Sequence, residues 1–207
     1  TITRWLKQGK LPVSKKGQHY SFQTADLERW AAKNHIKLNL TRPAPKTEKA
    51  DTLPSLSTAV EDAGVHYEIP GNDAGTAIEA AIGRMPFIPD EQKADLLSRI
   101  LEREMALSTG IGNGIAIPHA RDQQAYIESP MVFVAYLSHP IEYKAMDNRP
   151  VSILFFLLCP DLKDHLHLLS VLSFCLRNER FVEFLKSRPV EEELLEKLSL
   201  LEQTYMI

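Results

Sequence analysis

The sequence predicts an α/β fold, a three-layer αβα sandwich with a mixed sheet, together with a small additional module at the N-terminus. Residues 130–137 and 151–159 are apolar over most of their length, which is the pattern of buried strands. Segments with helical apolar spacing precede and follow them. Helices on both faces of a largely buried sheet make three layers. At 207 residues, the chain can bury one such core and still carry a small module.

The N-terminal module is predicted to be a helix, a β-hairpin and a second helix. Residues 1–8 have one apolar face, and Gly9 ends that helix. Residues 11–22 alternate around a basic tip at residues 15–18, which is typical of a hairpin. Thr24 is placed to cap the second helix, whose first turn is acidic. The module is assigned to residues 1–37.

The charge of the chain is divided between its two ends. The first 49 residues carry a formal charge of +8 and the remainder −11, which together give the net −3. A basic head on an acidic body indicates a module that faces nucleic acid, although a solvated basic tail would give the same charge.

Two segments of the module, IxRWLKxGKLP and DLERW, resemble the winged helix-turn-helix of the excisionase/MerR-like families. The family's preceding helix is absent from this sequence, so the module is partial. The resemblance implies that Thr3, Arg4 and Lys7 enter the major groove of DNA, while Lys15 and Lys16 on the wing contact the backbone or the minor groove. Use of the same fold as a scaffold or protein contact is the alternative.

Residues 38–53 are predicted to be a linker. Pro43 and Pro45 block a helix there, and charges of both signs replace apolar residues. The body then covers residues 54–207. Its expected elements are, in order, a helix at 56–63, a strand at 66–69, a helix at 73–85, a helix capped by Asp90, strands at 130–137 and 151–159, a helix at 163–176 and two C-terminal helices.

Composition favours a cytoplasmic protein without a membrane span. Cys159 and Cys175 lie in apolar runs and are better explained as reduced core thiols than as a disulfide framework. The longest strongly apolar run, at residues 151–159, is about half of what a membrane helix needs. No signal-peptide pattern opens the chain. It also lacks an initiator Met, which indicates a fragment or a trimmed chain.

The most informative segment is STGIGNGIAIPHAR, from Ser108 to Arg121. Gly110, Gly112 and Gly114 permit positive φ and bring backbone N–H groups close to an anion. A histidine delivered beside such a loop by a short strand is suited to hold a phosphoryl group. The segment lacks the lysine of a P-loop and the spacing of a dinucleotide fingerprint, and no acidic cluster is placed to hold Mg²⁺, which disfavours a nucleotide enzyme or a hydrolase.

The same fourteen residues closely resemble the active-site segment of enzyme IIA domains of the phosphoenolpyruvate-dependent sugar phosphotransferase system. The resemblance is to the fructose/mannitol type, including its nitrogen-regulatory branch, and it covers essentially residues 54–207. It implies the three-layer fold already expected from the pattern. It also implies that His119 accepts the phosphoryl group through Nε2.

The resemblance also implies two supporting groups. Arg103, in the RE pair before STG, matches an active-site arginine whose planar fork suits phosphate oxygens, although an isolated arginine there would by default pair with a neighbouring glutamate. His165, in DHLHLLSVL, matches a helical histidine beside the acceptor. His167 is its rival, and because residues two apart point to different sides of a helix, only one can face the site. We favour His165.

The remaining loop residues are Ser108, Thr109 and Arg121. Ser108 and Thr109 either add hydroxyl donors for the phosphate or cap the turn. Arg121 is expected at the rim of the site, where it would help to receive a partner. The two histidines of the helix are not spaced for a metal site, so no metal or other cofactor is expected.

The predicted function is a phosphohistidine carrier that takes its phosphate from a small HPr-type protein. No IIB or IIC partner segment lies in this sequence, which favours a regulatory output, in transcription or in nitrogen and carbon metabolism, through the basic module. One alternative is a DNA-binding regulator whose enzyme IIA-like domain only senses or dimerises. Another is a sugar-uptake enzyme IIA component. The sequence leaves the oligomeric state open.

Overall fold

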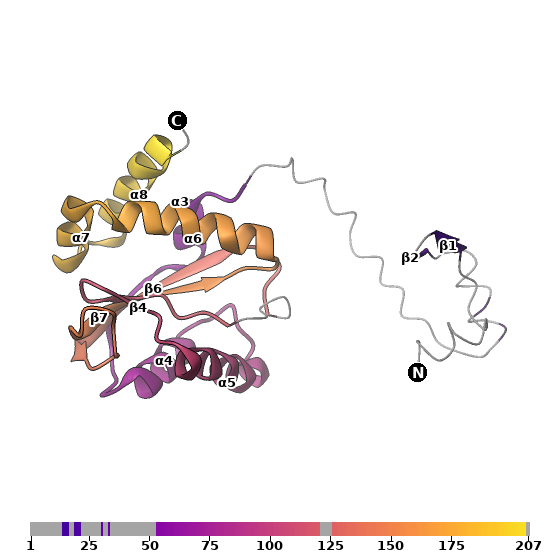
Figure 1. The fold of residues 1–207 in the computed structure, drawn as a ribbon, viewed down its shortest axis with the longest axis horizontal. Coiled ribbons are helices and arrows are strands. Elements are labelled where there is room, and N and C mark those ends of the chain that lie inside the picture. Colours follow the sequence, from indigo (N-terminus) through magenta and orange to yellow (C-terminus); the bar gives the residue numbers. More distant parts are fainter. Residues whose placement is uncertain are drawn as a thin grey trace. The chain divides into compact units, whose positions relative to one another are not determined.

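A computed structural model describes residues 14–16, 19–21, 30, 33, 53–120 and 126–205. The chain divides into two compact units, Thr1–Asp51 and Thr52–Ile207, and each is described by itself (Figure 1). None of the helices in these ranges is long and apolar enough to cross a bilayer.

The first unit contains the predicted hairpin. Strand β1 (Ser14–Lys16) pairs antiparallel with β2 (His19–Ser21). Lys15 lies opposite Tyr20 and Lys16 opposite His19, so both lysines belong to the ladder rather than to the connection where the sequence pattern put them. The predicted DNA-contacting residues Thr3, Arg4 and Lys7 lie outside the described residues, as do residues 38–52 of the predicted linker and Arg121.

The second unit is built on one mixed five-stranded sheet in the order β3-β6-β7-β5-β4. Strands β3 and β6 are parallel, as are β5 and β7, while β6 with β7 and β4 with β5 are antiparallel. The elements are α3 (Leu56–Ala63), β3 (Val65–Ile69), α4 (Ala74–Gly83), α5 (Asp90–Ala106), β4 (Gly110–Gly112), β5 (Ile115–Ala116), β6 (Met131–Ile141), β7 (Val151–Leu158), α6 (Leu162–Leu176), α7 (Glu179–Lys186) and α8 (Glu191–Tyr205).

Alternation along the central strands β6 and β7 builds two apolar cores. Val134 and Phe155 point into one core, which α3, α6, α7 and α8 cover. Phe133 and Phe156 point into the other, beneath α4 and α5. The helices accordingly lie on the two sides of the sheet in Figure 1. The predicted three-layer αβα sandwich with a mixed sheet is confirmed, because both strands carry apolar side chains on both faces.

The helix starts show where local sequence rules succeed and where they miss by a residue. Asp73 caps α4 by accepting a hydrogen bond from the Thr76 N–H at 2.8 Å. The expected cap of α5 is corrected: Asp90 is its first helical residue, Pro89 occupies the cap position and no side chain caps it. An acidic side chain in the first turn still favours the helix, since it faces the positive end of the helix dipole. Asp90 also pairs with Lys93 at 2.8 Å.

Candidate functional site

The short strand β5 leads to His119, which lies just beyond the end of that strand. After β5 the chain continues through the buried residues Ile117 and Pro118, and the His119 side chain is half-buried. Its Nδ1 lies 2.8 Å from the carbonyl oxygen of Ile117. A carbonyl only accepts hydrogen bonds, so Nδ1 must carry the proton. In the neutral ring, Nε2 is therefore left with its lone pair.

His165, in the first turn of α6, lies beside His119. The two ring centroids are 5.2 Å apart, with an interplanar angle of 47°. Asp161 begins this helix by accepting from the Asp164 N–H at 2.9 Å, which fixes the turn that carries His165. His167 points to a different side of the helix, where its ring packs edge-on against that of Tyr205 of α8, with 6.4 Å between the ring centroids. Of the two histidines weighed from sequence, the structure places His165 against His119.

Both imidazoles are favoured in their neutral form. Burial lowers the pKa of His119 and the nearby Arg103 lowers it further, while the hydrogen bond to Ile117 and the charge of Glu104 raise it, with a net fall below 6.5. Burial also lowers the pKa of His165, with a smaller contribution from His119. A neutral ring with a free nitrogen is the form of histidine that acts as a nucleophile.

Arg103 comes from the last turn of α5, near enough to His119 to act on its charge. Its Nη1 donates a 2.6 Å hydrogen bond to the carbonyl oxygen of Leu107. That bond satisfies one of the carbonyls that the end of a helix leaves unpaired. A guanidinium carries five N–H donors, so this contact commits only part of the group.

The hydroxyls of Ser108 and Thr109 are engaged within the protein. Ser108 Oγ donates to the carbonyl oxygen of Tyr143 at 2.8 Å and accepts from the Gly110 N–H at 3.2 Å. Thr109 Oγ1 donates to Glu104 at 2.5 Å, and its N–H donates to the same carboxylate at 2.8 Å. In this structure both side chains fasten the start of β4 to its surroundings.

The glycines of the motif are needed where residues 143–149 approach β4. A Cβ on Gly110 would lie 2.7 Å from the Cα of Ala145, closer than real side chains come. Gly112 and Gly114 have φ of +97° and +82°, which disfavour any other residue. The carboxylate of Asp147 accepts from the Asn113 N–H at 2.8 Å. Strand β4 itself was missed from sequence, since three residues with two glycines carry no strand pattern.

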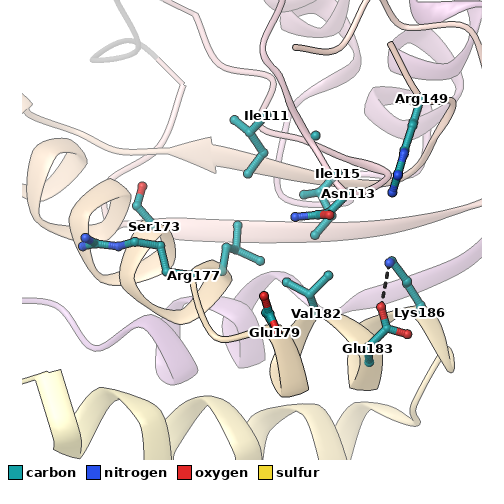
Figure 2. A pocket seen from close by; sticks show the side chains of 12 residues that line it. Ile111, Asn113, Ile115, Arg149, Ser173, Arg177, Glu179, Val182, Glu183 and Lys186 are labelled. Carbon is teal, nitrogen blue, oxygen red and sulfur yellow. Dashed lines mark hydrogen bonds and ion pairs between the residues drawn. The ribbon is translucent and has the colours of Figure 1, made fainter. Parts of the chain in front are cut away.

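A separate groove lies at the other end of α6, with a volume of about 690 Å³. Its walls are residues 111–113 and 115, Arg149, the end of α6 and α7 (Figure 2). Glu183 and Lys186 form an ion pair of 2.8 Å along one side. Its lining residues do not include the two site histidines.

Among the described residues, no three His, Cys, Asp or Glu side chains lie close enough together to hold a metal ion. Sequence reasoning overlooked Glu104, which it treated only as a salt-bridge partner of Arg103. The adjacent RE pair was the available signal, because two opposite charges just before the glycine motif lie on the same turn. The hydrogen bond from Ser108 to the Tyr143 carbonyl joins residues 35 apart in the sequence, so no local pattern could have predicted it.

Solved structures share this fold. The nitrogen regulatory protein IIA-Ntr from Neisseria meningitidis superposes with a TM-score of 0.56 at 27% identity, covering 70% of this chain and 95% of that one. IIA mannitol from Escherichia coli gives 0.53 over 64% of this chain and 93% of its own, and at 17% identity it supports the fold alone. The second unit is thus an enzyme IIA-type α/β domain.

Sequence comparison gives the family. Residues 72–200 match the family described as phosphoenolpyruvate-dependent sugar phosphotransferase system, EIIA 2, and the chain belongs to it. Membership gives the second unit a phosphocarrier role in general terms. Residues 1–35 match a helix-turn-helix domain, in agreement with the N-terminal module expected from the sequence.

Curated relatives match about half of the chain. A nitrogen regulatory protein of Klebsiella oxytoca is 44% identical over 99 residues, which are 47% of this chain and 60% of the relative. A PTS system fructose-specific EIIA component of Haloferax volcanii is 39% identical over 102 residues, 48% of this chain and 59% of the relative. The chain thus spans about three fifths of the length of these relatives.

Proposed function

We propose that the second unit is a histidine phosphoryl carrier. His119 Nε2 accepts a phosphoryl group from the phosphohistidine of an HPr-type protein and later passes it on, without nucleotide, metal or other cofactor. The observation that carries the proposal is the Nδ1 contact with the Ile117 carbonyl, which leaves Nε2 as the ring nitrogen with a lone pair. A neutral ring beside an arginine is what in-line attack on phosphorus requires.

The transfer exchanges one P–N bond for another. The lone pair of His119 Nε2 forms the new bond to phosphorus, and the pair of the breaking bond stays on the donor imidazole. The Nδ1 proton of His119 stays in its hydrogen bond to Ile117 throughout. Negative charge on the three transferring oxygens is met by Arg103, whose remaining N–H donors suit them, and by His165.

The predicted role of the motif's other residues as phosphate ligands stays a prediction. Ser108 and Thr109 would have to exchange their present partners to reach a phosphate. For Gly110 and Gly112, the closely packed residues 143–149 supply a structural reason for the missing side chains, and for Gly114 the positive φ of +82° supplies one. Arg103 is therefore the group that we expect to contribute most.

A protein donor is supported by the apolar surface next to the site. Met105 and Leu107 follow Arg103 and are 82% and 71% exposed, and Leu162 and Leu166 flank His165 at 67% and 53%. Exposed large apolar side chains gathered around polar functional groups are typical of a surface that receives another protein. The acidic charge of the body, −11 from Ala50 onward, would attract a basic donor.

For the onward step, an EIIB-type protein is one candidate acceptor. The E. coli IIAMTL structure solved with phosphorylated IIBMTL, which has a TM-score of 0.52 to this chain at 16% identity, documents such a pair for that protein. The matched nitrogen regulatory proteins favour a regulatory output instead. We place the carrier in the cytoplasm, in keeping with its two buried cysteines, which are not joined in a disulfide.

We further propose that the helix-turn-helix module reads the phosphorylation state out onto DNA, through Thr3, Arg4 and Lys7 and the wing residues Lys15 and Lys16. The match of residues 1–35 and the +8 charge of the first 49 residues support this output. DNA binding measured across a salt series tests it. Arg4→Ala and Lys15→Ala/Lys16→Ala are expected to weaken binding and to flatten its salt dependence. Binding that ignores both would remove the DNA claim.

Phosphate labelling tests the carrier. The protein is incubated with an HPr-type carrier labelled at its phosphohistidine, and wild type is expected to gain a phosphate that is labile in acid and stable in base. His119→Ala is expected to remain unlabelled, while His139→Ala, which changes an exposed histidine, is labelled like wild type. An unlabelled wild type would favour the alternative, a regulator whose enzyme IIA-like domain only senses or dimerises. Equal label on His119→Ala would also overturn the proposal.

A further inference from the structure

Glu104 is held in a fixed position between the end of α5 and the start of β4. Its two carboxylate oxygens accept from the N–H and the hydroxyl of Thr109, at 2.8 and 2.5 Å. Thr109 is buried, and Glu104 is itself partly buried. The side chain therefore cannot turn away into solvent without breaking both bonds, and its charge stays at one place relative to the site.

The placement of this carboxylate is unexpected for a phosphate site, because a negative charge opposes the arrival of a phosphoryl group. Arg103 and Glu104 are neighbours on α5. Thr109, which holds Glu104, also accepts from the Ile117 N–H at 3.1 Å, and the Ile117 carbonyl lies 2.8 Å from Nδ1 of His119. At this short remove, the charges of Arg103 and Glu104 act on His119 in opposite directions. From α6, the group that faces His119 is the neutral ring of His165, and from the chain before it the Ile117 carbonyl. Among these described groups, Glu104 is thus the one anionic side chain that acts on His119.

We infer that Glu104 offsets Arg103 at His119 and so keeps the bound phosphoryl group easy to release. This inference rests on the proposed function. A carrier must accept a phosphoryl group and also give it away, so the equilibrium constant of each transfer has to stay near one. Arg103 alone would stabilise the phosphorylated form. A fixed carboxylate in range of the same ring lowers the stability of phosphorylated His119 without contacting the phosphorus itself. Donation of the phosphoryl group then becomes more favourable and its acceptance less so.

Thr109 is what makes the carboxylate effective. A charge that is held in place by two hydrogen bonds needs no rearrangement when the phosphoryl group arrives, whereas a mobile carboxylate would swing away and lose its effect. The N–H and the hydroxyl of Thr109 satisfy the carboxylate without neutralising its charge. Glu104 is in this sense a positioning residue, which acts through His119.

The test compares two glutamines on the same helix. Glu104→Gln removes the charge and keeps an oxygen for the Thr109 N–H, while Glu102→Gln removes an exposed charge two residues away. Each variant is mixed with the phosphorylated HPr-type donor until transfer stops, and the phosphate on each protein is measured by ³¹P NMR. For Glu104→Gln the equilibrium is expected to shift toward phosphorylated His119 by about fivefold to tenfold, as for one unit charge acting through a partly solvated medium. Glu102→Gln is expected to match wild type.

A second measurement separates charge from structure. The pKa of the His119 ring, followed by NMR without any donor, is expected to fall in Glu104→Gln and to stay unchanged in Glu102→Gln. Thr109→Val keeps the carboxylate but loses one of its anchors, and is expected to shift the phosphoryl equilibrium by less than Glu104→Gln does. If Glu104→Gln fails to fold, Glu104→Asp withdraws the charge by one methylene and is expected to give a smaller shift in the same direction.

The outcomes distinguish this inference from the function on which it rests. A wild-type protein that takes no phosphate overturns the proposed function, and the inference with it. A wild-type protein that is labelled, with an equilibrium that ignores Glu104→Gln or shifts toward the donor, overturns the inference alone. An equal shift in Glu102→Gln also overturns it, since the effect would then not come from the Glu104 charge.

Discussion

The two ends of α6 have different surroundings. At its start, the ring of His165 lies 5.2 Å from that of His119, and Arg103 and Glu104 from α5 act on the same place. At its end lies a groove of about 690 Å³, where the charged side chains of Glu183 and Lys186 already satisfy each other. The groove and the pair of histidines therefore lie at opposite ends of the same helix. Neutral, half-buried imidazoles that converge from different elements are the better sign of a reactive site.

The strongest test of this difference between the two ends of α6 is to remove the positive charge of Arg103, which comes from α5 and acts on His119. Arg103→Ala is expected to slow phosphoryl transfer from the HPr-type donor to His119 by about 10²- to 10³-fold, because a positioned donor to the developing charge is lost. Arg103→Lys is expected to recover part of the rate, since it restores the charge without the planar fork. Rapid-quench labelling measures both variants. Arg180→Ala, at an exposed position on α7, serves as the control, and an Arg103→Ala rate equal to the control would remove Arg103 from the site.

The two histidines of α6 give the next largest difference. His165→Ala is expected to lower the transfer rate by about tenfold to a hundredfold, as for the loss of one polar partner of the charged transition state. His167→Ala is expected to stay within about threefold of wild type, because its ring contacts Tyr205 rather than His119. The same labelling assay ranks them. If His167→Ala were the slower variant, the orientation of α6 in this account would be wrong.

Much of the fold could be predicted because its determinants are local. The boundaries of α3 at residues 56–63 follow from apolar spacing, and the choice of His165 over His167 needed only the geometry of a helix together with the family resemblance. Strand β7, apolar on both faces, revealed a sheet covered on both sides.

The rest depends on residues that meet only after folding. Gly110 packs against Ala145, and Ser108 donates to Tyr143, across about 35 residues of sequence. No local pattern reports such pairs, so the sequence favoured phosphate binding as the reason for the glycines and missed the close approach of residues 143–149. The role of Glu104 was hidden for the same reason, since its partner Thr109 lies directly before a strand that the sequence did not predict.

The pH dependence of transfer sharpens the contrast between the buried pair and an exposed histidine. Burial lowers the pKa of His119 below 6.5, so the neutral, nucleophilic ring persists to lower pH than in solvent. The transfer rate is expected to be flat from about pH 8 to pH 6.5 and to fall only below that, toward tenfold per pH unit. Rates measured at constant ionic strength test this, with the donor's own pH profile subtracted. A midpoint above 6.5 would contradict a desolvated ring.

The same burial has a consequence for stability. In the unfolded chain both histidines have ordinary pKa values near 6.5, whereas in the folded chain those of His119 and His165 are lower. The unfolded state therefore binds protons first as the pH falls, and the free energy of unfolding is expected to decrease below about pH 6.5. Urea unfolding at pH 7.5 and pH 5.5 measures the change. His165→Ala is expected to show a smaller decrease than wild type, because one of the two buried rings is gone.

The smallest effect is expected at the end of α6. Arg149 and Arg177 extend from opposite walls of the groove (Figure 2), whose lining residues do not include the two histidines. Arg177→Ala and Arg149→Ala are each expected to change the rate of phosphoryl transfer by less than about twofold, in the range of an exposed substitution that touches no reacting group. A loss comparable to that of His165→Ala would mean that the groove takes part in transfer. Since residues 111–113 line the groove and β5 leads on to His119, the connection between the two ends would then have to run through the glycine segment.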